Sequence, residues 1–284
     1  MEEPGRVGAI SPAAPIVIPE KAGGEAQLAA MPEAEALGPR LRGDDGACSY
    51  HPGMQMLAIL SLADWLALAW SLAVWVGYAW YSRRASATGV TLLATTNRWR
   101  TRWMIQATGR DPRVLDGIIV QSLSSSPSFF ASATLIIIGG LLALLGTTDK
   151  AAEFVREIPF ATRTTLLVFE LKVLCLMAIF VFAFFRFTWS MRQYTFAALV
   201  LGSMPSPEAF EQGRFDREEV AGRAGKLVGM AAETFNDGIR AYYFSFAALA
   251  WFVSPLALAI AAAVVAAVLY AREFNSYVLH VLRD

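Results

Sequence analysis

The chain of 284 residues is 56% hydrophobic and 17% charged, and its mean hydropathy is +0.45. Soluble domains average about 45–50% apolar and about 25% charged residues, so this composition indicates a protein that lies in lipid. The formal net charge of zero argues against a nucleic-acid-binding protein. Two cysteines and two histidines are too few for a disulfide framework or a His/Cys metal cluster, so we predict no metal site and no cofactor.

The N-terminal segment, residues 1–55, is acidic and rich in Pro, Gly and Ala. It lacks the apolar content that a folded core requires, and it has no apolar stretch typical of a signal peptide. We therefore expect a disordered tail. Two interpretations stay open: the tail belongs to the protein, or synthesis starts at Met54 or Met56 and residues 1–53 are not translated.

Four apolar segments follow the tail. A transmembrane helix needs about 20 predominantly apolar residues. The segments that meet this requirement are residues 56–81, 128–145, 166–187 and 243–271. The sequence therefore predicts an all-α fold, a four-helix transmembrane bundle in a membrane domain of residues 56–284. Pro255 is expected to kink the fourth span.

Basic residues in the loops predict the orientation. The segment 82–127 holds seven arginines and two acidic residues, and Arg186 and Arg192 flank the third span. Lys and Arg are enriched in cytoplasmic loops, so we expect the two long loops to be cytoplasmic and both termini to lie outside. The chain would then be a multi-pass protein of a bacterial inner membrane.

Both long loops carry amphipathic patterns. Arg98 and Arg102 share one side of a helix beside Trp99 and Trp103, which is typical of a basic helix on anionic headgroups. Asp111-Pro112 is a helix-start signal. Two apolar stripes then follow at helical spacing. They are Val114, Leu115, Ile118, Ile119 and Leu123, and later Val220, Ala224, Leu227, Val228, Ala231 and Phe235. We expect these loop helices mainly to cover the inner end of the bundle.

Three charges lie within the predicted spans, and such charges are rare in membrane helices. Asp64, Glu170 and Lys172 fall at one depth near the outer leaflet, and we predict that Lys172 pairs with Asp64. Glu170 and Lys172 are two residues apart, so they point to different sides of their helix. The cluster either fixes the helix register or forms a mouth for a cation or proton.

Arginines gather at the inner ends of the spans. Arg186, Arg192 and Arg240, with Tyr242, are candidate contacts for a phosphate or lipid headgroup, as are Arg98 and Arg102. The alternative is that they are ordinary cytoplasmic anchors. The string Asn236-Asp237-Gly238 is expected to supply a turn and a helix cap.

Several strings resemble the domain of unknown function 599 family, from about Leu62 to the C-terminus. That resemblance implies a multi-span membrane protein, as found in bacteria and plants, and it assigns no activity. The strings are Arg98–Trp103, Arg113–Asp116, Ser128–Ser132, Ile138–Leu142, Arg156–Phe160, Glu170–Lys172, Phe185–Gln193, Gly238–Phe244 and Leu269–Phe274.

The chain lacks the phosphate-binding, dinucleotide-binding, zinc-protease and nucleophile-elbow motifs of common enzymes, so we predict no catalytic residues and no enzyme. We expect a non-enzymatic membrane scaffold or assembly protein, whose partners are the bilayer and anionic headgroups on the cytoplasmic side. Gly139 and Ala143, like Ala259 and Ala263, have the spacing of close helix contacts and allow a homo-oligomer. Two alternatives are an oligomeric solute or ion pathway through the intramembrane charges and a membrane enzyme acting on lipid.

Overall fold

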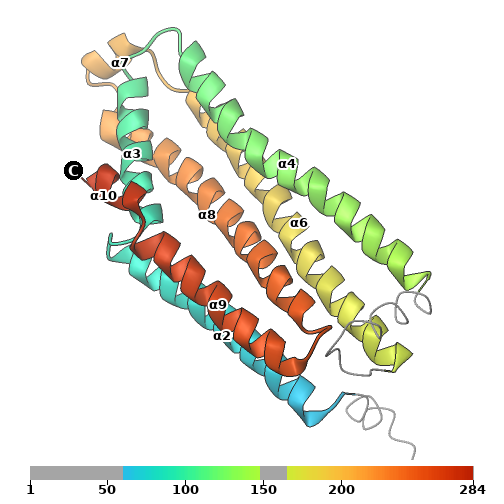
Figure 1. Ribbon diagram of the computed structural model, residues 1–284. Coiled ribbons are helices and arrows are strands. Elements are labelled where there is room, and N and C mark those ends of the chain that lie inside the picture. Colours follow the sequence, from blue (N-terminus) through green and yellow to red (C-terminus); the bar gives the residue numbers. More distant parts are fainter. Residues whose placement is uncertain (1–59, 148–164, 284) are drawn as a thin grey trace, which may run out of the picture. The chain divides into compact units, whose positions relative to one another are not determined.

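A computed structural model of the chain describes residues 60–147 and 165–283. The predicted tail, residues 1–55, lies outside the described residues. Within the described ranges the chain forms helices joined by short connections (Figure 1). They are α2 (Leu62–Ala87), α3 (Leu92–Ala107), α4 (Val114–Leu145), α6 (Leu166–Gly202), α7 (Pro207–Glu211), α8 (Arg217–Ala250), α9 (Pro255–Phe274) and α10 (Tyr277–Arg283).

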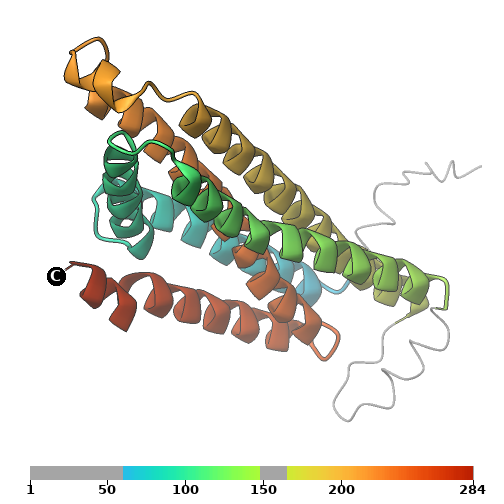
Figure 2. The same ribbon diagram turned by 90° about the horizontal axis from the view of Figure 1, so that it is seen from above.

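Helix α8 lies between two helix pairs. α2 packs against α9, α4 packs against α6, and α8 contacts both α6 and α9 (Figures 1 and 2). α3 lies across one end of α8 and also contacts α10. This order leaves α2 and α4 at the two edges of the arrangement.

Local capping sets where the long helices begin. The side chains of Ser61, Thr165 and Ser254 each accept a hydrogen bond from a backbone N–H in the first turn of α2, α6 and α9. Asp216 does the same for α8, with Glu218 and Glu219 as donors. Each such cap contributes about 1 kcal/mol, because it satisfies a backbone donor that the helix itself leaves unpaired.

The outer surfaces of the long helices are apolar. Four helical segments are long and apolar enough to cross a membrane: α2, α4, α6 and Pro255–Arg283. In α4, however, only 11% of the apolar 18-residue stretch is buried within the protein. Phe129, Leu135 and Ile136 of α4 are exposed. Apolar side chains in this number need a lipid solvent. The predicted all-helical membrane protein with four helices able to span is confirmed.

The fourth predicted span, 243–271, is wrong as one continuous helix. α8 ends at Ala250 and α9 begins at Pro255, so the chain turns between them and reverses direction. Ser254 is fully extended and caps α9, and Pro255 has no N–H to continue α8. Because both flanking segments are apolar, composition alone could not distinguish a kinked helix from a helical hairpin.

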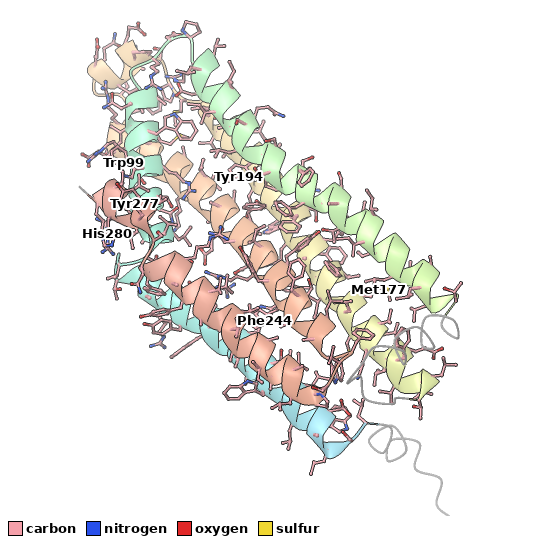
Figure 3. The ribbon with its side chains drawn as sticks, in the orientation of Figure 1. Trp99, Met177, Tyr194, Phe244, Tyr277 and His280 are labelled. Carbon is pink, nitrogen blue, oxygen red and sulfur yellow. The ribbon has the colours of Figure 1, made fainter. Side chains whose placement is uncertain are left out.

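This reversal also changes the predicted topology. The Trp99 indole of α3 donates to the Leu282 carbonyl of α10 at 3.1 Å, and Arg283 donates to the Val90 carbonyl. Trp99 and His280 mark this end of the helices in Figure 3. The prediction that the C-terminus and the first long loop lie on opposite sides is therefore wrong, because the extra turn returns the chain to the α3 end.

The loop helices follow the predicted pattern in part. Ala224, Val228 and Ala231 of α8 are fully buried against the α3 and α6 residues of a common core, as the second stripe predicted. α4 begins at Val114, two residues after Pro112, and Val114 with its neighbour Leu115 is exposed. The first stripe is therefore exposed at its start, and its last residue, Leu123, packs against this core.

Candidate functional site

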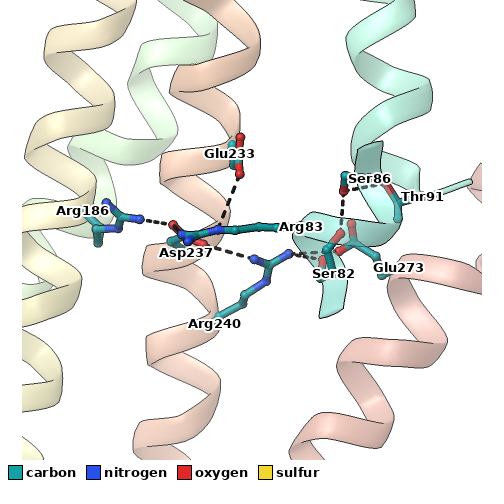
Figure 4. Close-up of polar contacts among 9 residues, drawn as sticks. All are labelled: Ser82, Arg83, Ser86, Thr91, Arg186, Glu233, Asp237, Arg240 and Glu273. Atoms are coloured by element: carbon teal, nitrogen blue, oxygen red, sulfur yellow. Dashed lines mark hydrogen bonds and ion pairs between the residues drawn. The ribbon is translucent and has the colours of Figure 1, made fainter. Parts of the chain in front are cut away.

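Three arginines from three helices meet on one buried carboxylate, Asp237 of α8 (Figure 4). Arg83 of α2 donates to Asp237 Oδ2 at 2.6 Å, and Arg186 of α6 donates to the same oxygen. Arg240 of α8 lies 3.1 Å from Oδ1. Asp237 is 6% exposed. Because its partners come from α2, α6 and α8, this buried carboxylate links three helices.

Arg240 extends this network to α9. It is 4% exposed, donates to Ser82 Oγ at 2.7 Å and lies 3.6 Å from Glu273 Oε2. Arg83 is also 3.7 Å from Glu233 Oε1, near the exposed side of the network. We call Arg83, Arg186, Arg240 and Asp237 the arginine cluster. It places three cations around one buried anion, while Glu233 pairs with Arg83 and Glu273 with Arg240.

An apolar groove ends at the arginine cluster. A pocket of about 440 Å³ between α2 and α6, with α8 as its floor, is lined by Trp75, Trp80 and Phe182 and by Arg83 and Arg240. A second pocket of about 360 Å³ shares Trp75 and Phe182 and continues along the same helices as far as Trp251. We call the two together the lateral groove. It is apolar along its length and charged at one end.

The comparison with protein families covers most of these residues. A family model described as "Protein of unknown function, DUF599" matches residues 66–278, well over half of the chain. The chain belongs to the DUF599 family. The matched range contains the whole arginine cluster and both walls of the lateral groove, and it agrees with the range of the resemblance seen in the sequence. No curated protein and no solved structure matches this DUF599 chain.

The sequence identified part of the arginine cluster. The structure brings Arg186 and Arg240 together, whereas Arg192 is exposed and apart from them. Tyr242 shares a hydrogen bond of 2.6 Å with Thr134 of α4 and packs among aromatic rings, away from the arginines.

Asp237 is where the sequence-based interpretation was wrong. Asn236, Asp237 and Gly238 lie inside α8 and form neither a turn nor a cap. The Asp237 carboxylate accepts from arginine side chains rather than from a nearby backbone N–H, so the local capping preference does not apply. A signal was available: Arg83 and Arg186, each in or beside a predicted span, needed an acidic partner in apolar surroundings.

The two α3 arginines of this DUF599 protein lie outside the arginine cluster. Arg98 donates to the Gly89 carbonyl at 2.6 Å, where Gly89 has a positive φ of 78° in the turn after α2. Arg102 lies over the Trp99 ring at 4.8 Å. Both side chains are exposed, so they remain candidate headgroup contacts.

The intramembrane charges of the DUF599 chain form a second polar cluster at the other end of the lateral groove. Lys172 donates to the Trp251 carbonyl at 2.8 Å, and the Trp251 indole donates to Asp64 Oδ1 at 2.7 Å. The predicted direct pair of Asp64 and Lys172 is therefore wrong, because Trp251 joins them. Glu170 is partly exposed and bonds to no other described residue.

Proposed function

We propose that this DUF599 protein is a non-enzymatic membrane protein that binds an anionic phospholipid. The acyl chain would lie in the lateral groove, and the phosphate would contact Arg83 and Arg186. One observation carries the proposal: an apolar groove within the membrane helices is lined at one end by Arg83 and Arg240, two of the three arginines that bind the Asp237 carboxylate.

Recognition would depend on the charged end of the groove. A lipid chain gains little by leaving other lipid chains for an apolar groove, so affinity must come from the headgroup. Guanidinium groups match phosphate oxygens in geometry and charge. The Arg83 side chain is 51% exposed and the Arg186 side chain is 29% exposed. Both therefore have donors to offer a ligand.

The depth of the arginine cluster also supports a headgroup ligand. From Leu62 to Arg83, α2 rises about 32 Å at 1.5 Å per residue, while the hydrocarbon core is about 30 Å thick. Arg83 therefore falls near one boundary of the core, where lipid phosphates lie. The apolar part of the lateral groove, lined by Leu68, Trp75 and Phe182, falls within the core.

The geometry favours binding over the other roles. Both oxygens of Asp237 accept hydrogen bonds from arginines, which leaves this carboxylate poorly suited to act as a base. Asp64 is likewise occupied by Ser61 and Trp251, which weakens an ion pathway through it. The scaffold role stays a prediction, since no contact within residues 60–147 and 165–283 identifies a protein partner.

The test compares lipids that remain bound to the purified protein. Wild type is extracted from vesicles of mixed anionic and zwitterionic phospholipids, and the retained lipids are quantified by mass spectrometry. We expect anionic phospholipid to be enriched, and Arg83→Gln to reduce that enrichment at least fivefold. Arg83 is the best site to change because Asp237 keeps two other arginines in this variant.

Arg192→Gln is the matched control, since it removes an exposed arginine of α6 far from the groove lining. It should leave the enrichment unchanged. Equal retention of both lipid classes by wild type, or an equal loss in both variants, would contradict the proposed function.

A further inference from the structure

The opposite face of α8 carries a second cavity with a different character. A pocket of about 440 Å³ is bounded by α3, α4, α6, α8 and α9 and is lined by Arg100, Ser122, Ser126 and Arg272, among others. We call it the polar pocket. Arg240 lines both this pocket and the lateral groove, so α8 separates the two and Arg240 reaches each.

The cations of the polar pocket exceed its anions. Arg100 donates to Thr96 Oγ1 at 3.0 Å and to Asn97 Oδ1 at 2.7 Å, which are both neutral. Arg272 donates to the Tyr243 hydroxyl at 3.0 Å. Neither arginine forms an ion pair within the described part of the chain. The Glu273 carboxylate of the lining faces Arg240, which also pairs with Asp237.

Arg100 is a partly buried cation of the polar pocket that has no acidic partner among the described residues. Burial lowers the pKa of the Arg100 guanidinium from its ordinary value, because desolvation disfavours the charged form. A bound anion would offset that cost, since an opposite charge at close range favours the charged form. Arg100 belongs to α3, which is not among the four helices able to span.

Hydroxyl groups face the same pocket. Ser122 and Ser126 are four residues apart on α4 and therefore lie on one side of the helix. Their hydroxyls donate to no other group in the described ranges, in contrast with Ser124 and Ser125, which bond to backbone carbonyls. Free hydroxyls beside two unpaired guanidinium groups are the donor set that phosphate oxygens require.

We propose that the polar pocket binds a phosphate group, with Arg100 and Arg272 as the cationic contacts and Ser122 and Ser126 as hydroxyl donors. The phosphate can belong to a water-soluble anion or to a lipid headgroup, and the two sources share this chemistry. The site is separate from the lateral groove, so it does not depend on the proposed phospholipid function.

The experiment is a calorimetric titration of the full-length protein in neutral detergent. One arm uses inorganic phosphate and the other a short-chain phosphatidic acid below its micellar concentration, each against sodium chloride at equal ionic strength. We expect at least one phosphate compound to bind, and the dissociation constant to rise at least tenfold in Arg100→Gln and in Arg272→Gln. Binding in only one arm identifies the source of the phosphate.

Two control variants separate this site from its alternatives. Arg192→Gln should bind both compounds as wild type does. Arg83→Gln should keep the binding of inorganic phosphate, because Arg83 lines only the lateral groove, whereas a change in its binding of phosphatidic acid reports on that groove. If Arg100→Gln fails to give a monodisperse protein, exposed Arg272 carries the test. No binding of either compound by wild type, or binding kept in both Arg100→Gln and Arg272→Gln, overturns the proposal.

Discussion

The indole nitrogen of Trp251 donates a 2.7 Å hydrogen bond to Asp64, although 187 residues separate the two in sequence. Trp251 follows the last residue of α8 at the turn before α9, and Asp64 lies in the first turn of α2. Lys172 of α6 donates to the carbonyl of the same tryptophan. The α8–α9 turn is therefore held from both sides, by α2 and by α6.

Trp251→Phe should destabilise the protein through this bond. The variant keeps an aromatic ring and the backbone carbonyl but removes the indole N–H, which leaves a buried oxygen of Asp64 with one partner fewer. Such a loss costs about 1–3 kcal/mol. The midpoint of thermal unfolding in detergent should fall by several degrees. Glu170→Gln, at a partly exposed position, is the control and should leave the midpoint unchanged.

The residues of the second polar cluster, Asp64, Lys172 and Trp251, could be predicted from the sequence only in part. Counting residues from the span ends placed Asp64 and Lys172 at one depth, and the structure brings both to Trp251. The role of Trp251 could not be predicted, because it lies in a turn within a continuous apolar segment, where composition does not show that the chain reverses. Composition shows that the chain has helices able to span a membrane, whereas the partner of a buried polar group depends on where the chain reverses.

The arginine cluster was likewise predicted only in part. The sequence placed Arg186 and Arg240 near one membrane surface, because positive charges mark that boundary. The residues around Asp237 suggested a local cap, so Asp237 was not recognised as the acidic partner that these arginines need. In the structure the long helix α8 continues through this position, so its carboxylate is presented to the neighbouring helices.

Asp237→Asn should be the most damaging single change in the arginine cluster. It leaves three guanidinium groups around a neutral amide, and removing one partner of a buried ion pair costs about 3–5 kcal/mol. We expect a sharp drop in the yield of folded protein and in the unfolding midpoint.

Glu233→Gln provides the contrast within the same network. Glu233 is 41% exposed and lies 3.7 Å from Arg83, so its loss should cost less than about 1 kcal/mol. Equal unfolding midpoints for the Asp237 and Glu233 variants would show that Asp237 does not hold the three helices together.

Gly238→Ala should be destabilising for a different reason. A Cβ atom there would lie 2.5 Å from Cε1 of Phe187, whose ring is fully buried among other aromatic side chains. Overpacking of this kind costs about 1–3 kcal/mol. Gly139→Ala is the matched control, because nothing lies within 4 Å of its Cβ position. Unfolding midpoints measured in one detergent should fall for Gly238→Ala alone.

Gly225 tests whether the packing of α3 on α8 supports the polar pocket. A Cβ at Gly225 would lie 3.0 Å from the Thr101 Cα, a backbone atom that cannot move without moving α3. Because Arg100 is the neighbouring residue, Gly225→Ala should weaken phosphate binding as well as stability.

Gly222→Ala lies one turn earlier on α8 and meets nothing within 4 Å. Alanine is favoured over glycine inside a helix by about 0.8–1.0 kcal/mol, so this variant should be at least as stable as wild type and should bind phosphate equally well. The two substitutions thus change stability in opposite directions. If both variants raise the unfolding midpoint, α3 does not pack on α8 as closely as the structure shows.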